Sequence, residues 1–406
     1  MNRAVSAFYR LHALSVYRKI LHQETVAAFE RLLSSLDKKP KKFLNAYSGF
    51  YSLLCENNFS ENFAQCFIEA AMFDDNCFTS AAAAKKVDSL PKAVVSAALN
   101  DLTTVLYLGT VSSGDILDAY KYKSDLEASS VFLPSWKADE EAYLTRDGLL
   151  EKAVRFHKEN GCGIFAKYRT FIWREDIIPV RHPDTISLSS LKGYEYQRGL
   201  VFDNTKAFME GKTCNNCLLY GDKGTGKSST VKAVANYFYQ YGLRIVEVPK
   251  ERLMDFPSLV DKIARIPMKF MIFIDDLSFL QQDESYASLK AVLEGGLAAK
   301  PKNAVIYATS NRRHIIKECF SDRQTDDVNR RDNMEESLSL SDRFGLSVCF
   351  SAPNKDKFLQ IVLALAEDYG IKADEQELCL GAERFALERG GRSPRCAKQY
   401  IKSLFR

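Results

Sequence analysis

The sequence predicts an α/β domain built on a parallel five-stranded sheet, with a mainly α-helical domain before it and a helical segment after it. Between residues 186 and 352, short apolar runs alternate with helical stretches, a pattern typical of a parallel sheet covered on both faces. A glycine-rich stretch, GDKGTGKSST, directly follows the first of these runs. Outside this region the apolar residues recur only at helical spacing.

Changes of pattern near residues 185 and 353 divide the chain into three predicted segments. At 406 residues the chain is too long for one ordinary core. We expect a mainly helical N-terminal domain over 1–185 that binds a client or partner, an α/β core over 186–352 and a helical lid over 353–406. The predicted strands are 217–220, 244–248, 269–274, 304–308 and 347–350.

The charged residues are distributed unevenly along the chain, and their distribution neither indicates nor excludes a nucleic-acid partner. Residues 1–185 hold 23 basic and 23 acidic residues, so the net charge of +4 comes entirely from the remainder. A weakly basic half is compatible with nucleic acid but does not indicate it. No apolar run approaches the roughly 18 residues of a membrane span, and the N-terminus lacks a signal-peptide core. We therefore expect a cytoplasmic protein without a membrane partner.

The glycine-rich stretch satisfies every fixed position of a phosphate-binding loop. Its glycines allow backbone N–H groups to curl around a β-phosphate, Lys227 reaches the β- and γ-phosphates, and the Ser228 hydroxyl binds Mg²⁺. A strand precedes the loop and a helix follows it, which places the phosphates at a helix N-terminus. The predicted nucleotide-binding residues are Gly221, Asp222, Lys223, Gly224, Thr225, Gly226, Lys227, Ser228 and Ser229.

A second motif, KFMIFIDD, places two carboxylates at the end of an apolar strand. Asp275 is predicted to bind the Mg²⁺ shell together with Ser228, and Asp276 to orient or deprotonate the attacking water. The alternative is an ordinary acidic turn after a core strand. The phosphate-binding loop upstream favours the metal site.

Three further residues are weak signals individually but form an ordered set. Asn311 ends the predicted strand AVIYATSN, where it could contact a γ-phosphate or the water. Arg343 lies in LSLSDRFGL, between a charged loop and the last strand, and Arg395 lies in the first turn of the last helix, in GGRSPRCAKQYI.

This ordered set resembles the AAA+ ATPases over residues 186–406. The stretch LKGYEYQRGLVFDNTKAFMEG is similar to the adenine-side box of that family. A bacterial AAA+ family known as domain of unknown function 815 has similar motifs in the same order, which in this chain read DNT…NNxLLYGxxGTGKSS…DDLSF…LSLSDRFGL…GGRSxR. More distant kin are the DnaA and DnaC initiator and helicase-loader group and the Holliday-junction motor RuvB.

The resemblance implies specific roles and an assembly. It implies that Asp276 is the catalytic acidic residue, that Asn311 is sensor one and that Arg395 is sensor two. It makes Arg343 an arginine finger that acts on ATP held by a neighbouring subunit, which predicts a homo-oligomer. A local salt bridge from Arg343 to Asp342 or Glu336 is the alternative. Many AAA+ motors carry Glu where this chain has Asp276, so hydrolysis is expected to be slow or switch-like.

The predicted function is therefore an ATPase that binds and hydrolyses Mg-ATP to drive assembly or remodelling of a protein or nucleoprotein complex, in the style of a helicase loader. The alternative is a slow ATP-dependent switch or protein-binding module with little turnover. The sequence does not name the client.

Overall fold

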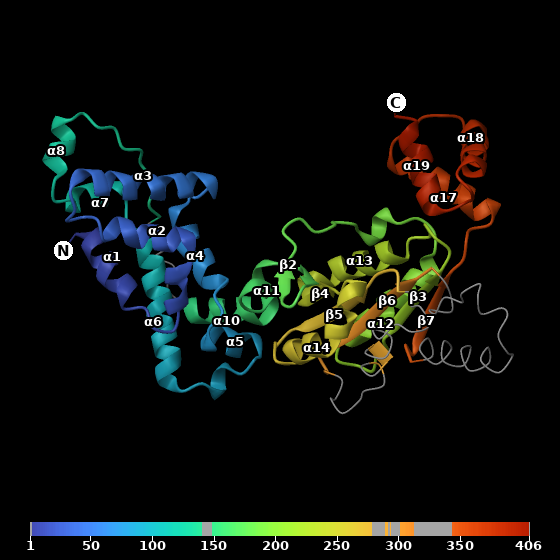
Figure 1. Cartoon of the computed structure of the whole chain (residues 1–406), viewed down its shortest axis with the longest axis horizontal. Helices are drawn as coiled ribbons and strands as arrows, with labels where there is room; N and C mark the ends of the chain where they lie inside the picture. The colour runs from blue at the N-terminus through green and yellow to red at the C-terminus, as the bar shows by residue number, and fades with distance from the viewer. Residues whose placement is uncertain are drawn as a thin grey trace. The chain divides into compact units, whose positions relative to one another are not determined.

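The computed structural model divides into two compact units, Met1–Lys167 and Tyr168–Arg406 (Figure 1). The structure describes residues 2–139, 148–277, 289–290, 293, 301–311 and 343–405. The division lies before the expected boundary at residue 185, because residues 170–179 pair with the sheet of the second unit.

The first unit is helical, as the sequence predicts. Pro40 occupies the first turn of its helix, where a missing N–H costs nothing, and Asn76 caps another helix through a capping box. Gly161, in a left-handed conformation (φ 85°), ends the helix expected near residues 149–159. The helices described are α1 (Arg3–His12), α2 (Glu24–Leu33), α3 (Pro40–Glu56), α4 (Phe63–Met72), α5 (Cys77–Ala83), α6 (Lys92–Leu108), α7 (Ser113–Ala119), α8 (Lys123–Ala128), α10 (Leu149–Asn160) and α11 (Ile164–Lys167).

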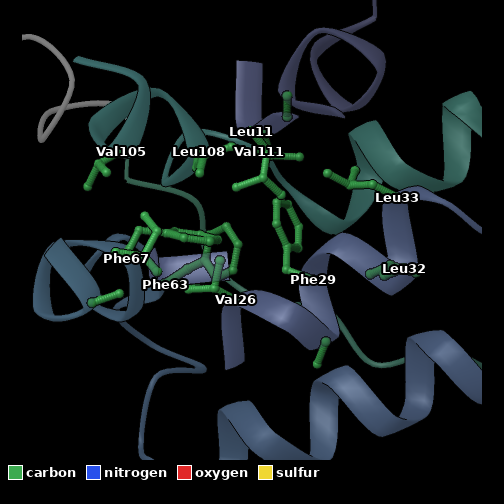
Figure 2. Close-up of a cluster of buried hydrophobic side chains, with 14 of the residues drawn as sticks. Leu11, Val26, Phe29, Leu32, Leu33, Phe63, Phe67, Val105, Leu108 and Val111 are labelled. Atoms are coloured by element: carbon green, nitrogen blue, oxygen red, sulfur yellow. The ribbon is translucent and has the colours of Figure 1, made fainter. Parts of the chain in front are cut away.

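Aromatic side chains fill the centre of this helical core (Figure 2). The ring of Phe29 lies 5.2 Å from that of Phe67 and 5.6 Å from that of Phe63, and all three side chains are fully buried. Edge-on ring pairs of this kind stabilise a core beyond the area that they bury.

The helices of the described residues were compared with the length and hydropathy of a membrane span. Among the described residues, no single helix is both long and apolar enough to cross a membrane. Helices α6 and α7, bent by 90° at their junction, pass that test only when taken together, on length and composition.

The second unit contains a seven-stranded sheet in the order β2-β1-β4-β5-β6-β3-β7. The five predicted strands are present and mutually parallel, which confirms the predicted fold class. Two short strands extend the sheet, because β1 pairs parallel with β4 and β2 pairs antiparallel with β1. The strands are β1 (Thr170–Trp173), β2 (Ile177–Pro179), β3 (Cys217–Gly221), β4 (Leu243–Glu247), β5 (Lys269–Ile274), β6 (Ala304–Ser310) and β7 (Leu346–Phe350).

The central strands are buried on both faces, which explains their unbroken apolar runs. Helices α12 (Glu195–Met209) and α13 (Lys227–Phe238) pack through Val201, Val234 and Phe238 against Phe273 and Tyr307 of the sheet. A third helix, α14 (Phe256–Ala264), precedes β5. Cys217 of β3 is a free thiol buried in this core, and burial raises its pKa to about 12.

The C-terminal lid has its own small core. It consists of α17 (Lys355–Asp368), α18 (Glu375–Glu388) and α19 (Pro394–Ser403), which pack through residues such as Phe358, Ala382 and Ile401. Arg392 and Glu383 form two parallel hydrogen bonds of 2.8 and 2.6 Å. This pair ties the loop before α19 to α18.

One buried carboxylate organises the N-terminal end of the first unit. Asp101 of α6 is 1% exposed, and its Oδ2 accepts hydrogen bonds from the backbone N–H groups of Ser15, Val16 and Tyr17 at 2.7–3.1 Å. The carboxylate therefore satisfies three backbone N–H groups in the turn between α1 and the 3₁₀ helix Arg18–His22.

We expect Asp101→Ala to lower the free energy of unfolding of this unit by about 3 kcal/mol, because buried backbone donors lose their acceptor. Urea unfolding should be followed by the fluorescence of Trp136 in a Trp173→Phe background, where it is the only tryptophan. The exposed Asp118, paired with Lys123 at 2.7 Å, provides the control, and Asp118→Ala should change stability by about 0.5 kcal/mol or less. Equal effects of the two substitutions would contradict this account.

Candidate functional site

The carboxyl ends of β3, β5 and β6 meet at one edge of the sheet, and the predicted motifs follow directly after them. Loop 221–226 follows β3, Asp275 and Asp276 follow β5, and Asn311 follows β6. Ligands of open parallel sheets bind at this edge. A cleft of about 520 Å³ lies here, within the usual range for a small-molecule site.

Loop 221–226 adopts a conformation that requires glycine at two positions. Gly221 (φ 126°) lies so close to β7 that an added Cβ would be 2.3 Å from the Phe350 carbonyl oxygen. Gly226 (φ 94°) precedes α13 in the left-handed region. The loop therefore turns sharply and presents the N-terminus of α13 to the cleft, where backbone N–H groups and the helix dipole favour an anion.

Lys227 is the charged centre of the loop. It is only 6% exposed, and its Nζ donates to the carbonyl oxygens of Gly221 (2.9 Å) and Asp222 (2.7 Å) and to Asn311 Oδ1 (3.1 Å). Burial lowers the pKa of the Lys227 ammonium. The negative charges of Asp222, Asp276 and Asp275 act in the opposite direction and raise it. An anionic phosphate in the cleft would restore the charge balance of this ammonium.

A chain of hydrogen bonds connects the loop to both carboxylates. Ser228 Oγ donates to Asp275 Oδ1 at 2.6 Å, and Thr309 Oγ1 donates to the same oxygen at 2.6 Å. The Asp276 backbone N–H in turn donates to Thr309 Oγ1 at 3.0 Å. Asn311 Nδ2 donates to Asp276 Oδ1, so that Asn311 bridges Lys227 and Asp276.

Thr309 is a site residue that the sequence did not indicate. It lines the cleft and is 2% exposed. The sequence indicated Asn311 at the end of this strand. Alternation along a strand places Thr309 and Asn311 on one side and Ser310 on the other, and this period-two rule could have identified Thr309.

The lid reaches the loop through the first turn of α19. Ser393 caps this helix by accepting from the Cys396 N–H at 3.1 Å, and the Arg395 backbone N–H donates to the Gly224 carbonyl oxygen at 3.1 Å. Gly224 (φ 77°) allows this approach, since an added Cβ would lie 3.0 Å from Ser393 Oγ. The contact places Arg395 and Lys398 on the wall of the cleft.

The opposite wall comes from the segment before α12. Tyr194, itself in the left-handed region (φ 60°), donates its hydroxyl to the Ser351 carbonyl oxygen at 2.6 Å and stacks on Phe350. Burial, with a smaller contribution from Asp222, raises the pKa of Tyr194 to about 12. Apolar side chains in this part of the cleft, Leu191 and Ile361 among them, offer a surface suited to a planar ring.

Most of the predicted site residues line this one cleft. The predicted residues that line it are Lys223, Gly224, Thr225, Gly226, Lys227, Ser228, Ser229, Asp275, Asp276, Asn311 and Arg395.

Three predicted site residues lie elsewhere among the residues that the structure describes. Gly221 lies beneath the cleft against β7, and Asp222 directs its carboxylate to the Ala352 N–H (2.6 Å), where it anchors the connection to the lid. Arg343 immediately precedes β7. Because β7 runs parallel to β3, Arg343 lies at the amino edge of the sheet, opposite the cleft. Its alternative partners, Asp342 and Glu336, lie outside the described residues.

The oxygen ligands of the cleft suit a hard divalent cation that is shared with a phosphate. Within the described part of the chain, no group of three or more His, Cys, Asp or Glu side chains could hold a metal ion. Ser228 Oγ and Asp275 Oδ1 supply two protein oxygens, and Mg²⁺ in phosphate sites commonly uses one or two carboxylates together with phosphate oxygens and water. The side chains present therefore fit Mg²⁺ bound together with a nucleotide.

The fold and the cleft define an α/β P-loop protein with a helical lid, the arrangement that the resemblance to the AAA+ ATPases implies. The chain belongs to the family described as "Protein of unknown function (DUF815)", whose model matches residues 166–406. This match confirms the family resemblance predicted from the sequence. The matched region starts close to the beginning of the second compact unit, Tyr168–Arg406.

Comparison with known proteins adds solved structures of a branch-migration motor. The Thermotoga maritima RuvB Holliday junction branch migration motor is 16% identical with a TM-score of 0.37, over 53% of this chain and 63% of that chain. A mutant of the same motor gives 16% identity and the same TM-score, over 53% of this chain and 64% of that chain. The chain thus spans less than two thirds of the motor's length. A search of curated proteins found no match.

We expect Gly224→Ala to weaken docking of the lid on the loop, because a Cβ would meet Ser393 and would strain a left-handed backbone. Hydrogen–deuterium exchange in the first turn of α19 should become about tenfold faster, which corresponds to about 1.4 kcal/mol. Gly211→Ala is the matched control, since Gly211 has nearly the same φ (74°) but nothing within 4 Å of the added Cβ. If both variants accelerate exchange in α19 equally, backbone strain rather than the contact with Ser393 is responsible.

Proposed function

We propose that the protein is an AAA+ ATPase that binds Mg-ATP in the cleft and hydrolyses it. The observation that carries the proposal is the convergence of Lys227, Ser228 and Asp275 from two strand ends on one cleft, with Asn311 and Arg395 on its walls. Enzymes that transfer a phosphoryl group from a nucleotide use a lysine that binds the phosphates and a carboxylate that binds the metal ion.

The chemistry of each side chain follows from its position. Lys227 exchanges its carbonyl partners for phosphate oxygens, and Arg395 adds positive charge from the lid. Ser228 and Asp275 hold Mg²⁺, which neutralises charge on the β- and γ-phosphates when it is bound. Asp276 accepts the proton of the attacking water, and Asn311 orients both Asp276 and the γ-phosphate.

Arg343 acts, in this proposal, on the nucleotide of a neighbouring copy. Strand β7 separates it from its own cleft by five residues, or about 16 Å at 3.3 Å per residue. The turn that presents it is tightly held, since Phe344 is fully buried and a Cβ on Gly345 would lie 2.7 Å from Asn215 Oδ1. An arginine on a fixed turn at the far edge of the sheet suits a site formed between two chains.

The ATPase rate per subunit should rise with protein concentration, and Asp276→Asn should lower kcat by about 10² to 10⁴ without loss of nucleotide binding.

Lys227→Ala should abolish binding of a fluorescent nucleotide, because its ammonium is the buried cation of the loop. Steady-state turnover and light scattering on the same samples provide the measurement. A wild-type protein that binds no nucleotide at any concentration would refute the proposed function.

Arg343→Ala should lower turnover by about 10³ and leave nucleotide affinity nearly unchanged. Mixing this variant with Lys227→Ala should restore part of the activity, since an intact Arg343 then faces an intact phosphate-binding loop across mixed interfaces. Arg265→Ala controls for lost surface charge, because Arg265 is exposed just before β5 at the same edge of the sheet. Failure of the mixture to exceed the sum of its parts would assign Arg343 a role within its own chain.

A slow molecular switch is the second candidate, and one contact favours it. Asp276 is shorter than the glutamate of many AAA+ motors, and its Oδ1 is already bonded to Asn311. Asn311 therefore occupies one of the lone pairs that Asp276 could offer to the attacking water, and the carboxylate retains its others. A turnover of a few per hour that does not respond to concentration would favour the switch over the motor.

The biological output that we propose is assembly or remodelling of a protein or nucleoprotein complex by a homo-oligomer. The helical first unit is the candidate for client binding, since it has a separate core and as many acidic as basic residues in its sequence region. Nucleic-acid binding would be recognised by a steep dependence of affinity on salt.

A further inference from the structure

We propose that Thr309 is a positioning residue that couples the metal-binding carboxylate to the water-activating carboxylate. This inference rests on the proposed ATPase function and assigns the coupling to a single hydroxyl group. Thr309 belongs to β6, the strand that lies between the loop strand β3 and the acidic strand β5. From this strand its short side chain reaches Asp275 and Asp276 at the end of β5, and Asp275 in turn is bonded to Ser228 of the loop.

The Thr309 hydroxyl uses its donor and one of its two lone pairs. Its only hydrogen is donated to Asp275 Oδ1 at 2.6 Å, and its oxygen accepts the Asp276 N–H at 3.0 Å. The side chain is 2% exposed, so water does not replace these partners readily. One hydroxyl therefore fixes the side chain of Asp275 and the backbone of Asp276 together.

The arrangement orients Asp275 for a metal ion. Ser228 and Thr309 both donate to Oδ1, and no described residue donates a hydrogen bond to Oδ2 in the network around the cleft. When Ser228 turns its hydroxyl oxygen to Mg²⁺, the bond from Thr309 remains as the constraint on this carboxylate. Hydrogen bonds of this outer kind tune metal affinity strongly.

The same residue holds an unfavourable backbone in place. Asp276 has a φ of 53°, in the left-handed region that residues with a Cβ rarely adopt. Two bonds to Thr309 support this turn, one from the Asp276 N–H to Oγ1 and one from the Leu277 N–H to the Thr309 carbonyl oxygen at 2.7 Å. The first of them depends on the hydroxyl, so its loss releases the Asp276 carboxylate from its position beside Asn311.

The test compares Thr309→Val, which keeps the shape and removes the hydroxyl, with Thr309→Ser, which keeps the hydroxyl and removes the methyl group. For Thr309→Val we expect kcat to fall about 100-fold and the KM for Mg-ATP to rise about tenfold, because the metal is held less tightly. Thr309→Ser should retain turnover within about fivefold of the wild type. Thr205→Val is the control for loss of a buried threonine hydroxyl, because Thr205 is fully buried and bonds Val201 and Tyr307 away from the cleft.

A binding measurement tests the same inference without hydrolysis. The affinity of a fluorescent ADP should be measured with and without Mg²⁺ for the wild type and each variant. Thr309→Val should leave the affinity without Mg²⁺ unchanged and reduce the Mg²⁺-dependent gain about tenfold. Thermal unfolding of each variant verifies that the fold is intact.

Each outcome decides the inference. A Thr309→Val variant with wild-type turnover and a wild-type Mg²⁺-dependent gain overturns it, as does equal loss in Thr309→Val and Thr309→Ser, which would assign the effect to packing. Loss confined to Thr309→Val supports it. Wild-type protein that binds ADP with an Mg²⁺-dependent gain but never turns over ATP would defeat the ATPase proposal, while the Mg²⁺ measurement would still decide the role of Thr309.

Discussion

The register between three parallel strands is the constraint on which the cleft depends. Tyr220 of β3 pairs with Ser310 of β6, and Ile274 of β5 pairs with Ala308 of β6, so that the three strands end at nearly the same level. Because successive side chains alternate between faces, a slip of one residue in β6 would turn Thr309 away from both carboxylates. The apolar side chains that bury β5 and β6 on both faces enforce this register. Packing in the core of the sheet therefore determines where the site residues lie at the carboxyl ends of these strands.

The sequence predicted those parts of the fold and the site that depend on a few consecutive residues. The loop 221–229, the acidic strand end and the five central strands each have a signature within a few residues, and the structure contains all five strands. The β1–β2 hairpin was missed because its strands are only four and three residues long and belong to the sheet through pairing with β4, far along the chain. Thr309 was missed for a related reason. Strand alternation places Thr309 on the same side as Asn311, but its partners Asp275 and Asp276 became evident only from the strand order, which places β6 beside β5.

Two glycines of the loop show why a motif is not a complete explanation of its residues. The motif assigns them to backbone curvature around a phosphate. In the structure Gly221 also makes room for the Phe350 carbonyl oxygen, and Gly224 makes room for Ser393 of the lid. The loop is therefore fitted on one side to β7 and on the other to α19. A phosphate that moves the loop must change its contact with the lid, since the Arg395 N–H is bonded to the Gly224 carbonyl oxygen. Through this hydrogen bond, binding of a nucleotide at the loop would change the position of the lid.

The positions of the cleft and of Arg343 restrict the symmetry of any assembly that joins them. The cleft lies at the carboxyl edge of the parallel sheet and Arg343 at its amino edge, so one chain cannot bring its own two elements together. Contact between the amino edge of one copy and the carboxyl edge of the next is heterologous. Repetition of that contact produces a closed ring when its rotation returns to the start, and a helical filament when it does not. In the proposed assembly, Arg343 of one copy would therefore face the cleft of another copy and not the cleft of its own chain.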